Sequence, residues 1–292
     1  MKIAQSVLSK LRFAFCNDIN QQRGLGVLRL RKSNIKPAYY VDNIQERDAL
    51  LKEIYQEIDL GIRWQDAIRK PAVTKHGERI AEYAYLASIF KQLCPVSIMD
   101  VGCVLNNPIF SGRIDAHCRI HFLNPSLEPV IYREYAYFKM PLDAWAEQMR
   151  FPLVTCLSTI EHIGFDNTRY GVDETDQGWD WSRCISETCS NVWRLLSLTA
   201  AGGLLIISCP FGRKEFVHHP PVVGVRTAQV LHTEHIAALR SQPFGHKLEI
   251  ITLRLCSTGW EICDPDAEYA AYGSIGPGAS GLILICAKGE EK

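Results

Sequence analysis

Hydrophobic and polar positions divide the chain into two regions with different periodicities. In the first region, apolar side chains recur at roughly three- and four-residue spacing, which is typical of helices. After about residue 95, short apolar runs alternate with polar or helical stretches, which indicates strands and helices in turn. The pattern predicts a mainly helical N-terminal extension over 1–72 and an α/β domain over 73–292.

Three segments of the first region are predicted to be helices. Residues 2–15 place apolar side chains near helical spacing with Lys and Arg between them, and this helix either docks on the domain or lies on a membrane. The longer segment 43–70 reads as a helix broken at Gly61. A stronger amphipathic pattern spans 77–93 and is predicted to end before Pro95.

Six β-prone runs follow, and several of them are almost entirely apolar, as in parallel strands covered on both faces. Between the third and fourth runs, residues 185–203 form a predicted helix that ends at a Gly-Gly pair. The last two runs are joined by the Pro- and Gly-rich segment 273–281 and are expected to pair antiparallel. We expect an α/β fold with a doubly wound, mostly parallel sheet and an antiparallel last strand. The six runs are residues 96–101, 118–123, 152–157, 203–209, 248–256 and 281–287.

Charge is distributed unevenly along a chain of zero formal net charge, with 32 basic and 32 acidic residues. Residues 1–40 hold eight Lys or Arg and one acid, a local charge of +7, so the rest of the chain carries −7. A basic arm favours an anionic partner or peripheral membrane contact, and a solvated extension packed on the acidic body explains it equally well. No nucleic-acid partner is expected.

The eleven cysteines are scattered singly, without CxxC pairs or zinc-ligand spacing, so no metal site is expected. The His-His-Pro-Pro segment 218–221 is read as a substrate loop or a simple loop, because adjacent histidines point apart in an extended chain. The N-terminal sequence does not read as a signal peptide, and no apolar run is long enough to span a bilayer. A cytoplasmic protein is expected, with membrane association through residues 1–40 as an option.

Candidate chemistry lies just after the predicted strands, because ligands of open parallel sheets bind at the carboxyl ends of the strands. The segment SIMDVGCVLNNP, residues 97–108, holds one glycine where a dinucleotide loop needs three. The chain also lacks the GK[ST] sequence of a P-loop. These absences argue against a diphosphate ligand and favour a nucleoside without phosphates.

Three blocks in order resemble class I S-adenosylmethionine-dependent methyltransferases: SIMDVGCVLNN (97–107), FPLVTCLSTIEHIGFD (151–166) and AAGGLLIISCPFG. The middle block is similar to the version in bacterial methyltransferases of cell-surface polysaccharide and glycan gene clusters. GERIAEYAYL (77–86) looks like the first helix of that group. The resemblance covers about 75–290 and implies a Rossmann-like fold with S-adenosylmethionine as the cofactor.

The resemblance implies cofactor-binding roles for residues after three strands. Asp100 and Gly102, with Cys103 beside them, match the turn that holds the methionine portion of the cofactor. Asn124 stands where the family has an acid that grips the ribose hydroxyls, so the charge-assisted part of that bond is lost. Ser158 and Thr159 match positions lining the sulfonium side.

The turn after Gly102 departs from the family pattern, because Cys103 to Asn107 replace a glycine-rich continuation. Asn106 and Asn107 tolerate left-handed backbone better than most residues and are predicted to preserve the turn. An ordinary strand-to-helix turn is the alternative for this segment.

Glu161 and His162 match the Glu-His pair that opens the next helix of the family, towards the methyl acceptor. Methyl transfer is an in-line displacement that depends on alignment, and a base helps when the acceptor is a hydroxyl. His162 is the candidate base because its ordinary pKa lies near neutrality, and Glu161 would orient it. A helix-start carboxylate and a buried, satisfied histidine are the structural alternatives.

Two aromatic segments have open roles. Trp179 and Trp181, in the polar insertion 169–184, could stack on a sugar ring or pack a long loop. Tyr135 or Phe138 could lie against adenine or pack within a strand.

The leading functional hypothesis is methyl transfer from S-adenosylmethionine to a hydroxyl of a sugar, glycan or lipid-linked precursor. The alternative is a non-catalytic methyltransferase-like binding protein, motivated by the departures after Gly102 and at Asn124. An NAD-dependent sugar enzyme is disfavoured because no pyrophosphate loop is found.

Overall fold

The computed structural model describes residues 37–114, 116–126, 129–146, 149–168, 175–218, 225–244, 247–264 and 280–289. The helix predicted over 2–15 and most of the basic segment 1–40 therefore lie outside the described residues. The same holds for most of 273–281, for 219–221 in the His-His-Pro-Pro segment and for 169–174 in the polar insertion.

An eight-stranded sheet forms the centre of the molecule, in the order β3-β2-β1-β4-β5-β10-β8-β9. The five strands from β3 to β5 are parallel, β10 runs antiparallel to both β5 and β8, and β9 closes the edge antiparallel to β8. This topology confirms the predicted doubly wound, mostly parallel sheet with an antiparallel last strand. The strands are β1 (Ser97–Val101), β2 (Arg119–Leu123), β3 (Tyr135–Phe138), β4 (Phe151–Leu157), β5 (Thr199–Pro210), β8 (Leu248–Cys256), β9 (Gly259–Ile262) and β10 (Gly281–Lys288).

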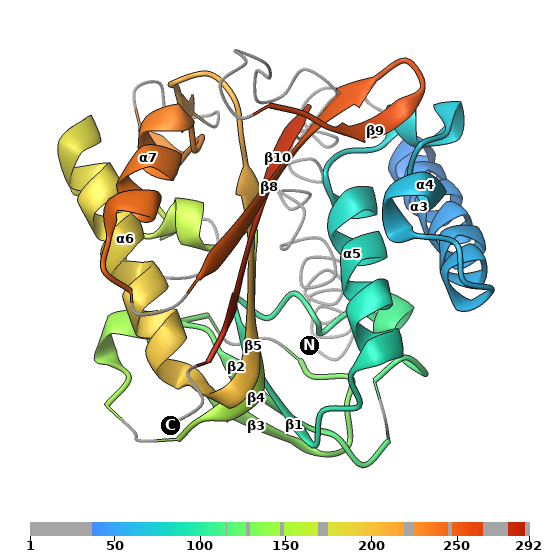
Figure 1. The fold of residues 1–292 in the computed structure, drawn as a ribbon, viewed down its shortest axis with the longest axis horizontal. Helices are drawn as coiled ribbons and strands as arrows, with labels where there is room; N and C mark the ends of the chain where they lie inside the picture. The colour runs from blue at the N-terminus through green and yellow to red at the C-terminus, as the bar shows by residue number, and fades with distance from the viewer. Residues whose placement is uncertain are drawn as a thin grey trace, which may run out of the picture.

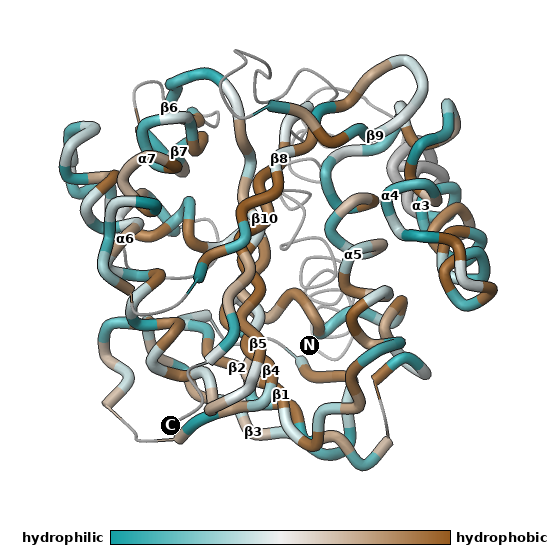
Figure 2. The backbone as a smooth tube through the Cα atoms, viewed as in Figure 1, coloured by the Kyte–Doolittle hydropathy of each residue, from teal (hydrophilic) through white to brown (hydrophobic). Residues whose placement is uncertain are grey.

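Helices cover both faces of this sheet (Figure 1). One face carries α5 (Arg79–Gln92), with α3 (Pro37–Asp59) and α4 (Trp64–Ala67) packed outside it, and the other carries α6 (Trp181–Leu198) and α7 (Thr233–Ser241). Each face has its own hydrophobic cluster, and Figure 2 shows apolar residues concentrated along the central strands. Among the described residues, no helix has the length and apolarity needed to cross a bilayer.

The N-terminal helices share one core with the sheet. Leu51 and Ile54 of α3 belong to the same buried cluster as Ile206 of β5. The break predicted at Gly61 is confirmed, because this residue separates α3 from α4 with a φ of +99°. Past α4, the Ile68 carbonyl accepts a hydrogen bond from the Trp260 amide of β9 at 3.1 Å.

Helix α5 corrects one expectation. Its pattern was predicted to be amphipathic, yet ten of its fourteen residues are buried. The reason is position: α5 lies between the sheet and α3, so it has no face turned mainly to solvent.

Helix α6 corrects another expectation. It was predicted to end at the Gly-Gly pair, but it ends at Leu198, and Gly202 and Gly203 lie inside β5. A Cβ on Gly203 would come within 3.0 Å of the Phe151 carbonyl oxygen, beside a register shift between β4 and β5. Gly203 therefore permits a close approach of the two strands, and the pair does not terminate the helix.

Three short strands were not predicted. β6 (Phe216–His218) and β7 (Arg226–Gln229) pair antiparallel as a separate two-stranded sheet, and β9 extends the edge of the main sheet. Strand β3 confirms the strand alternative for residues 135–138.

Candidate functional site

The carboxyl ends of four neighbouring strands meet at one edge of the sheet. The Gly102 amide after β1 donates to Leu123 at the end of β2 at 3.0 Å, and the Ser158 amide after β4 donates to Ser208 of β5 at 2.8 Å. Strand order reverses between β1 and β4, which is where open α/β sheets bind ligands. The structure thus brings together the segments that carry Asp100, Gly102, Cys103, Asn124, Ser158 and Thr159.

Thr159 lies directly over Gly102. A Cβ built on Gly102 would stand 2.0 Å from Thr159 Oγ1, and the φ of Gly102 is +96°. Both facts require glycine here, because a side chain would be strained and would collide with the end of β4. The β1 turn and the β4 turn therefore form one tight junction.

Asp100 faces the interior of this junction. Its side chain is fully buried, Oδ2 accepts from the Leu105 amide at 2.7 Å, and Oδ1 accepts from Thr155 Oγ1 at 2.8 Å. Burial raises the pKa of Asp100 from 3.8 to about 7. In this structure Asp100 holds the turn from inside, and its contact with the methionine portion of the cofactor stays a prediction.

The prediction that Asn106 and Asn107 supply left-handed backbone is wrong. The left-handed residue is Cys103, with a φ of +63°, directly after Gly102. Asn106 instead uses its side chain, because Nδ2 donates to Pro129 at 2.8 Å and Oδ1 accepts from the Ile131 amide at 3.0 Å.

Asn107 takes a third role in the same loop. Its Oδ1 accepts from the Ile109 amide at 3.1 Å and so caps the short 3₁₀ helix Pro108–Phe110. Both asparagines therefore act through their side chains rather than through backbone freedom.

Asn124 follows β2 and is buried. Its backbone N–H donates to the Phe138 carbonyl oxygen at the end of β3 at 3.2 Å, and its side-chain Oδ1 accepts from the Ser126 backbone N–H at 3.3 Å. The side chain thus closes a turn at the edge next to Gly102. Its contact with ribose hydroxyls stays a prediction.

A buried polar network on α5, missed by the sequence analysis, holds Ser158. Glu82 is fully buried, and its Oε1 accepts from Ser158 Oγ at 2.7 Å and from Ser208 Oγ at 2.6 Å. Arg79 donates to Glu82 Oε2 at 2.6 Å and balances its charge. The signal was present in the sequence, because Glu82 is the one acid in the otherwise apolar run AEYAYLASIF.

Glu161 and His162 lie on a 3₁₀ turn, Ile160–His162, and do not open an α-helix; the next one, α6, begins at Trp181. The expected helix-start position is therefore wrong. Glu161 is 1% exposed, and its Oε2 has no hydrogen-bond partner among the described residues. Burial raises the pKa of this carboxyl group well above its ordinary value.

His162 is oriented by a backbone carbonyl. Its Nδ1 lies 2.7 Å from the Thr227 carbonyl oxygen, and because a carbonyl only accepts, Nδ1 carries the hydrogen. In the neutral ring, the lone pair is then on Nε2, which lies 3.9 Å from Glu161 Oε1. Sequence reasoning could not find Thr227, because its contribution comes from the main chain.

The aromatic residues of the insertion pack within the protein. Trp181 stacks on Phe216 with ring centroids 4.1 Å apart, and the ring of Trp179 occupies the space where a Cβ of Gly164 would lie. These contacts support the packing alternative for both tryptophans. Phe138 stacks on His121 and meets Trp145 edge-on, which is also packing.

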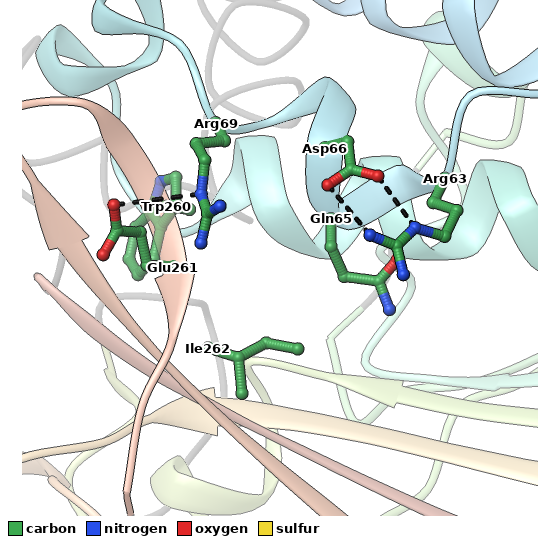
Figure 3. Close-up of a pocket in the computed structure, with 7 residues that line it drawn as sticks. All are labelled: Arg63, Gln65, Asp66, Arg69, Trp260, Glu261 and Ile262. Atoms are coloured by element: carbon green, nitrogen blue, oxygen red, sulfur yellow. Dashed lines mark hydrogen bonds and ion pairs between the residues drawn. The ribbon is translucent and has the colours of Figure 1, made fainter.

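A separate pocket of about 150 Å³ lies between α4 and β9 (Figure 3). Arg63 pairs there with Asp66, and Arg69 approaches Glu261 at 3.8 Å, so its charges balance one another. None of its lining residues belongs to the predicted site. Within the described parts of the chain, no three His, Cys, Asp or Glu residues are placed to hold a metal ion.

The sequence matches no protein-family model and no curated protein. Among solved structures, the N-methyltransferase NodS from Bradyrhizobium japonicum is 12% identical, with a TM-score of 0.41 over 73% of this chain and 97% of that chain. The 1,6-didemethyltoxoflavin-N1-methyltransferase of Burkholderia thailandensis, with S-adenosylhomocysteine bound, is 11% identical, with a TM-score of 0.41 over 88% and 92%. Coclaurine N-methyltransferase is 11% identical, with a TM-score of 0.43 over 98% and 99%. The fold of this chain is assigned from its own strand order.

Proposed function

We propose that the protein is an S-adenosylmethionine-dependent methyltransferase that acts on a hydroxyl of a sugar, glycan or lipid-linked precursor. The observation that carries this proposal is the Gly102–Thr159 junction at the switch point of a sheet with methyltransferase strand order. The three sequence blocks that resemble the family supply the residues of this junction.

The residues at this edge fit a nucleoside cofactor. The Gly102 turn brings the ends of β1 and β4 together at this edge, and the side-chain amide of Asn124 at the neighbouring strand end suits ribose hydroxyls. Thr159 and Ser158 border the β4 side of the same edge. When bound, S-adenosylmethionine supplies a methyl group on a positively charged sulfur.

His162 would accept the proton that the acceptor hydroxyl loses. The Thr227 carbonyl holds Nδ1–H, which leaves Nε2 as the basic nitrogen of the neutral ring. An imidazole fixed in one tautomer is suited to general-base catalysis. Glu161, 3.9 Å from Nε2, borders the ring on its other side.

Calorimetric titration with S-adenosylmethionine and S-adenosylhomocysteine tests the cofactor site. We expect both to bind, and Asn124→Ala to weaken binding about fivefold, because a hydrogen bond to ribose contributes about 1 kcal/mol. Asn107→Ala is the matched control: it removes the same side chain from the cap of a 3₁₀ helix and should leave affinity unchanged. Screening of sugar, glycan and lipid-linked acceptors then tests the substrate class.

A non-catalytic binding protein is the second candidate, and one observation favours it. Both oxygens of Asp100, the Asn106 side chain and the Ser158 hydroxyl all bond within the protein. Groups engaged in this way offer fewer contacts to a cofactor. Folded protein that binds neither S-adenosyl compound would support this candidate and contradict the methyltransferase proposal.

A further inference from the structure

Arg226, the first residue of β7, connects three segments around the Glu-His turn. Its guanidinium forms a two-point ion pair with Asp176, at 2.8 Å from Nε and 2.7 Å from Nη2, and Nη1 donates to the Trp179 carbonyl at 2.6 Å. Arg226 and Asp176 side chains are only 14% and 19% exposed. A paired and largely buried guanidinium of this kind fixes geometry more firmly than a surface pair does.

Aromatic rings bound the same guanidinium. Its central carbon lies 4.4 Å from the Phe216 ring centroid and 5.5 Å from that of Phe165. Phe216 belongs to β6, and Phe165 follows the Glu-His turn. A planar guanidinium satisfies the ion pair and these ring contacts together, which the ammonium of a lysine does not.

The backbone of β7 connects this ion pair to His162. The Arg226 carbonyl accepts from the Asp166 amide at 3.0 Å, and the next carbonyl, that of Thr227, holds His162 Nδ1 at 2.7 Å. The turn from 162 to 166 is therefore bonded at both ends to two successive residues of β7. The hydroxyl of Thr227 donates to Val217 of β6 at 3.2 Å and fixes that peptide from its other side.

We propose that Arg226 and Asp176 are positioning residues for His162: their ion pair sets the Thr227 carbonyl, which holds the imidazole with Nε2 as its basic nitrogen. The inference rests on the proposed function, because methyl transfer to a hydroxyl is the reaction in which Nε2 of His162 would accept a proton. Neither Arg226 nor Asp176 touches the reacting atoms, so their effect on catalysis passes through His162.

Titratable groups near His162 stand on its own turn, on β7 and on the segment that precedes α6. Glu161 stands on the same turn, Arg226 on β7, and Asp176 on the segment that precedes α6. The bonds from Arg226 lower the pKa of Asp176, so the ion pair persists across the neutral range. Loss of the pair would leave an unpaired charge close to the Thr227 peptide.

Nitrogen NMR of the histidine ring tests the proposal without an acceptor, because it reports which ring nitrogen of His162 carries the hydrogen. We expect the Nδ1–H form in the wild type and a mixture of both forms in Arg226→Lys and in Asp176→Asn. Arg63→Lys is the matched control, since Arg63 forms a two-point ion pair with Asp66 on α4 and should leave His162 unchanged. His162→Gln assigns the signal, and Asp176→Asn serves where Arg226→Lys does not fold.

Three outcomes separate this inference from the proposed function. An Nε2–H form in the wild type, or an unchanged Nδ1–H form in folded Arg226→Lys and Asp176→Asn, overturns the positioning role even where S-adenosylhomocysteine binds. The tautomer of His162 can instead change in the ion-pair variants while the protein binds no S-adenosyl compound. That result overturns the methyltransferase proposal and supports the control of His162 by the ion pair. With an acceptor in hand, the positioning role predicts a fall in kcat on the order of tenfold with little change in KM, and a shifted pH profile.

Discussion

Asp100 shows that a side chain at a strand end can form all its observed hydrogen bonds within the protein. The Leu105 amide and the Thr155 hydroxyl each donate to one of its oxygens, and no part of it is exposed. The carboxyl group therefore shapes the turn that brings Gly102 under Thr159. A sequence motif identifies the residue at this place, but its orientation depends on a strand more than fifty residues away.

Because of Asp100, the free energy of unfolding is expected to fall as the pH rises from about 4 to about 7. Because burial raises its pKa from 3.8 to about 7, the folded protein holds a proton in that interval that the unfolded chain releases. The loss is up to about 4 kcal/mol, at about 1.4 kcal/mol for each unit of pKa shift. Urea unfolding of the wild type and of Asp100→Asn at about pH 4 and about pH 8 measures it.

The difference between the two pH values should be smaller in the variant. His235, whose pKa burial lowers to about 3, acts in the opposite direction because its unfolded form takes up a proton in acid. Its contribution is the same in both proteins and cancels in the comparison. Equal pH dependence of both proteins would show that Asp100 is not the group responsible.

At the scale of elements, length and context decide what the sequence reveals. The apolar runs of β1, β2, β4, β8 and β10 are five to nine residues long, and their strands lie within a residue or two of the predicted limits. β6, β7 and β9 have three or four residues each, too few for a periodicity to stand out. These strands form because they pair with other strands, and the local sequence does not show which ones.

Glu82 on helix α5 likewise has partners that the local sequence does not identify. A lone acid in an apolar helix indicates a buried partner, yet the local pattern does not say that Ser158 and Ser208 would supply the hydroxyls. Those two serines are fifty residues apart in the chain and adjacent in the sheet. The network exists because β4 and β5 are neighbours.

Glu82→Gln is expected to lower the free energy of unfolding by about 3 kcal/mol. The change removes the charge opposite Arg79 and leaves a buried guanidinium without its carboxylate. Glu234→Gln is the control, because Glu234 pairs with Lys214 at the surface, where both side chains are exposed, and it should change the free energy of unfolding little. Urea denaturation measures both, and equal small effects would show that the α5 network does not stabilise the fold.

At the scale of the whole molecule, strand order assembles a site from distant parts of the chain. Gly102 and Thr159 meet because β1 and β4 are neighbours at the switch point. The family resemblance assigned both residues to the cofactor side of the sheet but did not predict their contact. The contact of His162 with Thr227 was not anticipated, because it involves a main-chain carbonyl and a second, two-stranded sheet. The candidate residues at the ends of the parallel strands could thus be named from the sequence, and the contact supplied by β7 could not.

The shared core predicts that the N-terminal helices and the sheet unfold together. Ile54 of α3 and Ile206 of β5 are both fully buried in one cluster, although they lie on opposite sides of the boundary predicted at residue 72. Ile54→Ala and Ile206→Ala should therefore each shift a single unfolding transition, by about 2 to 5 kcal/mol, as the cavity left by a buried side chain requires. Leu60→Ala, at a side chain 85% exposed, should cost less than about 0.5 kcal/mol. Circular dichroism and tryptophan fluorescence in urea should give coincident curves for all three variants. Ile54→Ala could instead split the transition and leave its second phase at the wild-type midpoint. In that case the helices before residue 72 form a separate folding unit, and the shared core does not make the two regions unfold cooperatively.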